Sequence, residues 1–162
     1  MRFTLIDRIT GLEPNVKITA VKNLSLAEEY LADHFPGFPV MPGVLMLEAM
    51  TQASAWLIRA SEDFAHSVVL LKEARNVKYA QFVEPGQTLA VTAEVVEQDG
   101  RLTKLKAQGT VAGQSAVSAR LVLERYNLAD EDPSRGLADD VVKAKLRELF
   151  ALLYRPPVAA AG

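Results

Sequence analysis

The stretch that decides the fold runs from His34 to Ala60 and reads HFPGFPVMPGVLMLEAMTQASAWLIRA. Its first part, His34–Gly43, holds three prolines and two glycines, a density that neither a helix nor a central strand accommodates. Its second part, Val44–Ala60, has no proline or glycine, and its few polar residues are Glu48, Thr51, Gln52, Ser54 and Arg59. A helix that is apolar nearly all round is a buried helix. The stretch therefore predicts a fixed loop that leads into a long, buried helix.

Strand-like segments flank this helix on both sides. Two precede it, Phe3–Thr10 and Val16–Val21, and five follow it: Val68–Glu73, Val77–Phe82, Thr88–Glu97, Leu102–Val111 and Ser115–Arg125. The Asp99-Gly100 pair between two of them is a strong hairpin signal. Because a single apolar helix needs a sheet wrapped around it, we expect the α+β class, with a curved antiparallel β-sheet around one long buried helix.

Two shorter helices complete the expected fold. Ser25 and Glu28 have the spacing of a capping box and predict a short helix that runs to about Ala32. After the acidic linker of residues 128–135, Asp139 or Asp140 is expected to start a last helix over Val141–Leu153.

Length and composition exclude several classes of protein. The 162 residues suit one domain, and 49% apolar residues rule out a disordered chain. With 18 basic and 20 acidic residues, the chain lacks the basic excess that is typical of nucleic-acid-binding proteins. No apolar run is long enough to cross a membrane. Asp7 and Arg8 interrupt any apolar leader, so we expect a soluble, cytoplasmic protein. With no cysteine, two histidines and no phosphate-binding motif, we expect no metal and no cofactor.

Two residues stand out as candidates for chemistry. Glu48 lies on the apolar helix, where a carboxylate must find a hydrogen-bond partner, become protonated or face a pocket. His34, at the entry of the rigid loop, carries the side chain most often used for general acid–base catalysis. Each has a purely structural alternative, but together they form an acid–base constellation in two different environments.

The start of the long helix is a third candidate. Gly43 follows Pro42, and the first N–H groups of a helix have no intrahelical acceptor. Together with the helix dipole they predict a site that polarises a carbonyl, the alternative being an ordinary capped helix start. Further along, Glu48, Thr51, Gln52, Ala55 and Arg59 fall near one stripe of the helix.

The segment His34–Gln52 strongly resembles the signature of the 3-hydroxyacyl-[acyl-carrier-protein] dehydratases, hotdog-fold enzymes of fatty-acid synthesis. The matching residues are His34, Phe35-Pro36-Gly37, Pro39, Pro42-Gly43-Val44, Glu48 and Gln52. The resemblance extends to Leu5–Arg8, Val16–Leu24 and Phe82–Gly86, and covers roughly residues 1–127. Gln87 replaces the usual aspartate, and Phe38 stands where relatives often have histidine or arginine.

The resemblance implies a hotdog domain over residues 1–127, with residues 128–162 as a linker and C-terminal helical extension. It implies that His34 and Glu48 are the catalytic pair, completed across the interface of a homodimer; assembly to trimers of dimers is common in the family. The reaction would convert a (3R)-hydroxyacyl-[acyl-carrier-protein] to the trans-2-enoyl thioester without a cofactor. The Gly43 N–H would polarise the thioester carbonyl, with Gln52 and Val44 in support.

Two rival functions stay open at this point. A hotdog thioesterase shares the fold and the thioester substrate but uses a carboxylate to activate water. A non-catalytic acyl-binding subunit would keep the motif and work in a complex. For the carrier protein, which is acidic, the region Val68–Asn127 offers eight basic residues against six acidic ones, a weak indication of a docking patch.

Overall fold

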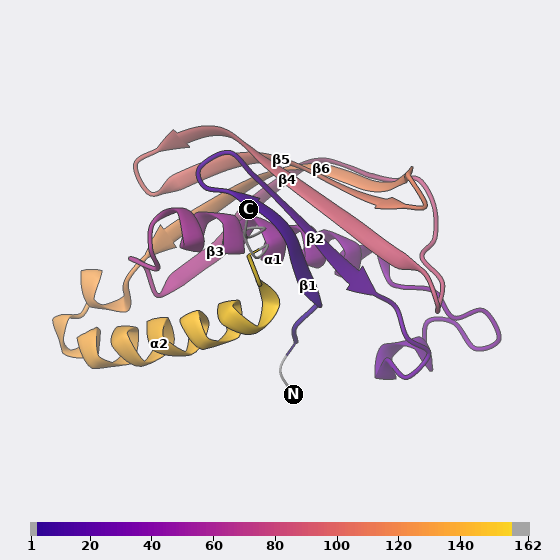
Figure 1. Cartoon of the computed structure of the whole chain (residues 1–162), viewed down its shortest axis with the longest axis horizontal. Coiled ribbons are helices and arrows are strands. Elements are labelled where there is room, and N and C mark those ends of the chain that lie inside the picture. The colour runs from indigo at the N-terminus through magenta and orange to yellow at the C-terminus, as the bar shows by residue number, and fades with distance from the viewer. Residues whose placement is uncertain (1–2, 157–162) are drawn as a thin grey trace, which may run out of the picture.

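The computed structural model describes residues 3–156 (Figure 1). Its six strands are β1 (Arg8–Glu13), β2 (Lys17–Asn23), β3 (Val68–Tyr79), β4 (Thr88–Asp99), β5 (Leu102–Val111) and β6 (Gln114–Tyr126). Its two long helices are α1 (Gly43–Ser61) and α2 (Gly136–Leu153), and three 3-10 turns are η1 (Glu29–Leu31), η2 (Leu128–Asp130) and η3 (Pro133–Arg135).

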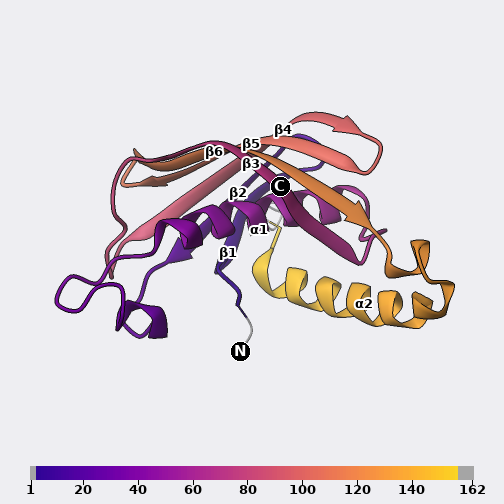
Figure 2. The ribbon, with the colours of Figure 1, turned by 180° about the vertical axis from the view of Figure 1, so that it is seen from behind.

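The strands form one antiparallel sheet in the order β1-β2-β4-β5-β6-β3. The sheet curves over α1, while α2 lies on the side of α1 away from the sheet (Figures 1 and 2). This arrangement confirms the predicted α+β hotdog fold with its C-terminal helix. Among residues 3–156, no helix has the length and apolar character needed to span a membrane.

Alternation along the strands places apolar side chains between the sheet and α1. In β5, Leu105 and Ala107 are buried on the concave face, whereas Lys104 and Lys106 point outward. Ten residues of α1, which packs on this face, are buried: Met46, Ala49, Met50, Thr51, Ala53, Ser54, Ala55, Trp56, Leu57 and Ile58. Each fully buried large apolar side chain contributes roughly 1.5–3 kcal/mol, so this contact fixes the helix in the sheet.

The predicted long helix and most strands are confirmed, β5 with the bounds expected. The two strands predicted at Val68–Glu73 and Val77–Phe82 are instead one strand, β3. Its register with β6 shifts between Leu71 and Glu73 and again between Arg75 and Lys78. These irregularities interrupt the alternation of apolar and polar residues that a regular strand shows. The sequence pattern therefore predicted two strands where the structure has one.

Two predictions for the N-terminal region are wrong. Instead of a helix over residues 25–32 there is only the turn η1, because the Glu28 carboxylate binds Lys22 Nζ rather than capping a helix. The first strand begins at Arg8 and not at Phe3. The segment before it is held by side-chain bonds from α1, since Gln52 Oε1 accepts from the Leu5 N–H at 2.9 Å.

The helix α2 ends at Leu153 as predicted but begins at Gly136, before the predicted start at Asp139 or Asp140. The buried Asp139 carboxylate accepts hydrogen bonds from the backbone N–H groups of Leu128 and Ala129, each at 2.9 Å, and from the Ser67 hydroxyl. This bonding ties the start of α2 to the end of the sheet. Further along, the Phe150 ring packs 5.9 Å from Trp56, so α2 also covers the second half of α1.

The two edges of the sheet differ. At one edge, Ile9 of β1 forms a parallel bridge with Tyr154, which follows α2. At the other edge β3 pairs, within residues 3–156, only with β6. This second edge carries the exposed apolar side chains Leu70 and Leu71. The β3 edge is therefore the part of the sheet left open for another strand.

We expect Asp139→Asn to lower the melting temperature at pH 7 by several degrees. Burial alone would raise the pKa of Asp139, but the Ser67 hydroxyl and the Ala129 and Leu128 amides bind its charged form and lower the pKa below its ordinary value. A lowered pKa stabilises the fold above the unfolded-state pKa of about 3.9, and this contribution is lost as the pH falls through the folded-state value.

Thermal unfolding of Asp139→Asn and the wild type at pH 7 and pH 3 measures this effect. The difference between the two proteins should shrink at the lower pH. The neighbouring exposed Asp140→Asn is the control and should match the wild type. An equal loss for both variants at pH 7 would contradict the assignment.

Candidate active site

The loop that carries His34 is held by its own backbone. The turn Phe35–Phe38 is closed by two hydrogen bonds, from the Phe35 N–H to the Phe38 carbonyl and from the Phe38 N–H to the Phe35 carbonyl, at 3.1 and 2.9 Å. Gly37 occupies it with φ +80°, a conformation that favours glycine. The Val40 N–H then donates to the His34 carbonyl at 3.0 Å, so both ends of the loop are tied together.

The His34 ring has a defined orientation and tautomer. Its Nδ1 lies 2.9 Å from the Val40 carbonyl oxygen, and a carbonyl oxygen only accepts. Nδ1 therefore carries the proton of the neutral imidazole, which leaves the lone pair on Nε2 available to take a proton. The stacked Phe35 ring, with centroids 4.1 Å apart, further restricts rotation of the imidazole.

The turn at Glu84–Gln87 and the residue before it, Val83, support this loop through hydrogen bonds. The Met41 N–H donates to the Val83 carbonyl at 2.9 Å, and the Gly86 N–H donates to the Leu24 carbonyl at 2.7 Å. Gln87, the residue that departs from the family pattern, closes this turn because its Oε1 accepts from the Glu84 N–H at 2.8 Å. Gln87 thus supplies a side-chain acceptor in the turn that anchors the His34 loop.

The start of α1 faces the same space as His34. Pro42 is its N-cap and supplies no side-chain hydrogen bond, so the Gly43 N–H belongs to the uncapped first turn. A Cβ added to Gly43 would lie 2.9 Å from Cε1 of Tyr79, which shows how closely that ring packs on the helix start. The supporting residue Val44 is 66% exposed, so one side of the helix start is open.

These residues line one pocket of about 560 Å³. Its lining consists of His34, Phe35, Met41, Gly43, Val44, Met46, Tyr79, Ala80, Gln81 and Phe82. Phe38, the other departure from the family pattern, contacts this lining, since its ring meets Phe82 edge to face at 5.6 Å. Both rings are exposed, and they form an aromatic rim beside the histidine.

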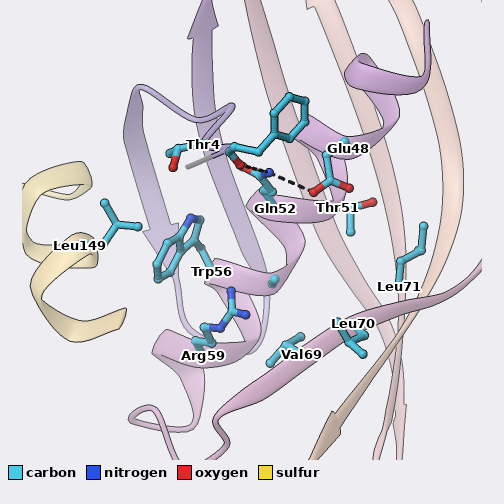
Figure 3. A pocket seen from close by; sticks show the side chains of 12 residues that line it. Thr4, Glu48, Thr51, Gln52, Trp56, Arg59, Val69, Leu70, Leu71 and Leu149 are labelled. Atoms are coloured by element: carbon cyan, nitrogen blue, oxygen red, sulfur yellow. Dashed lines mark hydrogen bonds between the residues drawn. The ribbon is translucent and has the colours of Figure 1, made fainter. Parts of the chain in front are cut away.

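Glu48 is held from its own helix. Gln52 Nε2 donates to Glu48 Oε1 at 2.9 Å and to the Phe3 carbonyl at 3.0 Å (Figure 3). Gln52 Oε1 accepts from the Leu5 N–H. The backbone partners fix which end of the Gln52 amide is oxygen and which is nitrogen. Gln52 therefore ties the carboxylate to the N-terminal segment, a connection that sequence spacing alone did not indicate.

Glu48 lines a different pocket from His34, of about 480 Å³. The lining of this second pocket is Phe3, Thr4, Glu48, Thr51, Gln52, Ala55, Trp56, Arg59, Val69, Leu70, Leu71 and Leu149. Within one chain the predicted residues thus form two groups, His34 with Gly43 and Val44, and Glu48 with Gln52. Tyr79 and Leu149 join them from distant parts of the chain, where no local sequence signal marks them.

Comparison with known proteins identifies the family. A family model described as the FabA-like domain matches residues 1–120. The chain is similar to two proteins named 3-hydroxyacyl-[acyl-carrier-protein] dehydratase FabZ. That of Levilactobacillus brevis is 38% identical over 116 residues, which cover 72% of this chain and 78% of the relative. That of Janthinobacterium sp. (strain Marseille) is 36% identical over 135 residues, which cover 82% and 86%.

Solved structures with low sequence identity share the fold. The dehydratase heterocomplex ApeI:P from Xenorhabdus doucetiae matches with a TM-score of 0.65 and 18% identity, over 82% of this chain and 90% of that one. The structure of smu.793 from Streptococcus mutans, bound to acetyl CoA, matches with a TM-score of 0.60 and 14% identity, over 77% and 91%. The family model and the FabZ relatives go further than the fold and confirm the predicted resemblance: the chain belongs to the 3-hydroxyacyl-[acyl-carrier-protein] dehydratase family.

Proposed function

We propose that this protein is a 3-hydroxyacyl-[acyl-carrier-protein] dehydratase, a lyase that converts (3R)-hydroxyacyl thioesters to trans-2-enoyl thioesters and water. The observation that carries the proposal is the fixed imidazole of His34, whose Nδ1 proton is held by the Val40 carbonyl. This histidine belongs to a motif that also supplies Glu48 and the open helix start at Gly43. The named relatives support the same activity.

Each group has one role in the elimination. Nε2 of His34 removes a proton from C2, and the electron pair of that C–H bond begins the new C2=C3 double bond. The Gly43 N–H, with the dipole of α1 behind it, donates to the thioester oxygen as enolate charge develops there. The carboxyl group of Glu48 gives its proton to the departing C3 hydroxyl, which leaves as water.

Gln52 acts through Glu48 and is a positioning residue. Its amide nitrogen holds one carboxylate oxygen, Oε1, and leaves the other, Oε2, for the substrate. Because Gln52 is itself fixed by Phe3 and Leu5, the carboxyl group keeps one direction relative to α1. Val44 supports the site as part of the wall beside His34.

The complete site is formed by a homodimer in this proposal. His34 and Glu48 line separate pockets of one chain, so a shared substrate needs the histidine of one subunit and the glutamate of the other. The open β3 edge, with exposed Leu70 and Leu71 beside the Glu48 pocket, supplies a surface for pairing. Trimers of such dimers and a cytoplasmic location, both expected from the sequence, stay predictions.

An acyl carrier protein delivers the substrate in this proposal. Three exposed basic residues lie on neighbouring strands, since Arg120 is in register with Arg75 on one side and with Lys106 on the other. Lys78, next to Tyr79 of the His34 pocket, extends this group. Like charges placed side by side repel one another, and an acidic partner relieves that repulsion.

The rival functions predict different products. A thioesterase would release a free acid and a thiol, whereas a dehydratase keeps the thioester and forms a conjugated double bond with an ultraviolet absorption. A non-catalytic subunit would yield neither product. The FabZ relatives favour the dehydratase over both rivals.

We expect His34→Ala and Glu48→Gln each to lower the dehydration rate by roughly 10²-fold or more, because each removes a proton-transfer group. The rate is followed through the enoyl product formed from 3-hydroxyacyl thioesters, with circular dichroism to verify folding. Rates within threefold of the wild type for both variants would refute the assignment.

Co-expression of the two inactive variants tests the shared site. A mixed dimer would combine the intact His34 of one subunit with the intact Glu48 of the other at one of its two sites. Random pairing then restores about one quarter of the wild-type activity. If both groups act within one chain, the mixture stays inactive, and the intersubunit assignment fails while the dehydratase assignment stands.

Replacement of Lys106 and Arg120 together by glutamate should weaken carrier-protein binding by at least tenfold at low salt. The salt dependence of binding should also become shallower, because fewer charge contacts remain to be screened. Titration of the acyl carrier protein at two salt concentrations measures both effects, with the exposed Lys145→Glu on α2 as the control. Salt-independent binding by the wild type would contradict the docking patch.

A further inference from the structure

The Glu48 pocket ends at a basic group that the elimination does not use. Arg59 lies eleven positions after Glu48 on α1, so both face the same side of the helix, about 16 Å apart along its axis. Side chains on a helix lean toward its N-terminus, which brings the guanidinium back toward Glu48. Figure 3 shows Arg59 at one end of the pocket and the Glu48–Gln52 pair at the other.

The guanidinium of Arg59 lacks a counterion in residues 3–156. Its Nε is buried without a hydrogen-bond partner, and none of the ion pairs in this part of the chain includes Arg59. Its guanidinium lies over the Trp56 ring, whose centroid is 5.2 Å from Cζ. Burial lowers the pKa of Arg59 to about 10, which leaves the group cationic at neutral pH.

The walls between the two ends are apolar. Val69, Leu70 and Leu71 of β3 form one side, and Trp56 of α1 with Leu149 of α2 forms the other. An alkyl chain suits these walls, and the volume of about 480 Å³ lies in the range of small-molecule sites. A purely hydrocarbon chain, however, would bury the cation further without giving it a partner, which is unfavourable.

We propose that this pocket selects acyl chains that end in a carboxylate, with Arg59 as the residue that binds the distal anionic group. The proposal rests on the dehydratase function, since the thioester end of the chain must lie near Glu48. Planar guanidinium and carboxylate groups match in a paired hydrogen-bond geometry, and apolar neighbours such as Trp56 and Val69 strengthen that pair. The substrate class is therefore the (3R)-hydroxy thioester of a dicarboxylic acid.

The experiment compares two 3-hydroxyacyl thioesters of equal chain length, one ending in a methyl group and one in a carboxylate. The wild type should process the carboxylate form with at least tenfold higher kcat/KM. Arg59→Met, which keeps the length and apolar character of the side chain, should reverse this preference and improve use of the methyl form. Arg147→Met is the matched control, because Arg147 also stacks on an aromatic ring, Phe64, but lies outside the pocket.

Binding of the corresponding saturated thioesters, measured by calorimetry, separates this proposal from the dehydratase function. A carboxylate preference in binding that disappears in Arg59→Met supports the pocket even if no enoyl product forms. Dehydration of both substrates with equal efficiency by the wild type overturns the proposal and leaves the dehydratase function intact. A preference that persists in Arg59→Met, or a loss of dimerisation in that variant with no wild-type preference, also overturns it.

Discussion

Burial of one face of α1 against the concave side of the sheet is the constraint on which the rest of the molecule depends. Apolar side chains such as Ala49, Met50 and Ala53 fill this contact completely. Because the buried face has one orientation, the opposite stripe with Glu48, Gln52 and Arg59 has one orientation too. The same packing positions the helix start at Gly43 beside the His34 loop, so the geometry of this pocket follows from core packing.

Much of the fold could be predicted because its patterns are local. The apolar run of α1 and the alternation of apolar and polar residues in β5 can each be recognised within the segment itself. Both elements appear with nearly the bounds expected. The predictions failed where a residue outside the segment competes with the local signal. Glu28 is drawn away from its capping position by Lys22, and the segment at Leu5 is bonded by Gln52 instead of by a neighbouring strand.

The site shows the same division. The motif in the sequence was sufficient to single out His34, Gly43 and Glu48, because all three lie within one short segment of loop and helix. Their separation into two pockets depends on side-chain directions that spacing does not reveal. Arg59 fell on the predicted polar stripe, but its lack of a counterion is visible only when the surrounding strands and α2 are in place.

The unequal sheet edges have a consequence for the newly made chain. Tyr154, at the end of α2, pairs with Ile9 on the β1 edge, so part of that edge is covered by the chain itself. The β3 edge, twelve residues long, is not covered by any segment of residues 3–156 and carries the exposed side chains of Leu70 and Leu71. Such an edge recruits any extended peptide that it meets. If the proposed dimer forms through this edge, pairing also removes a site of aggregation from the newly made chain.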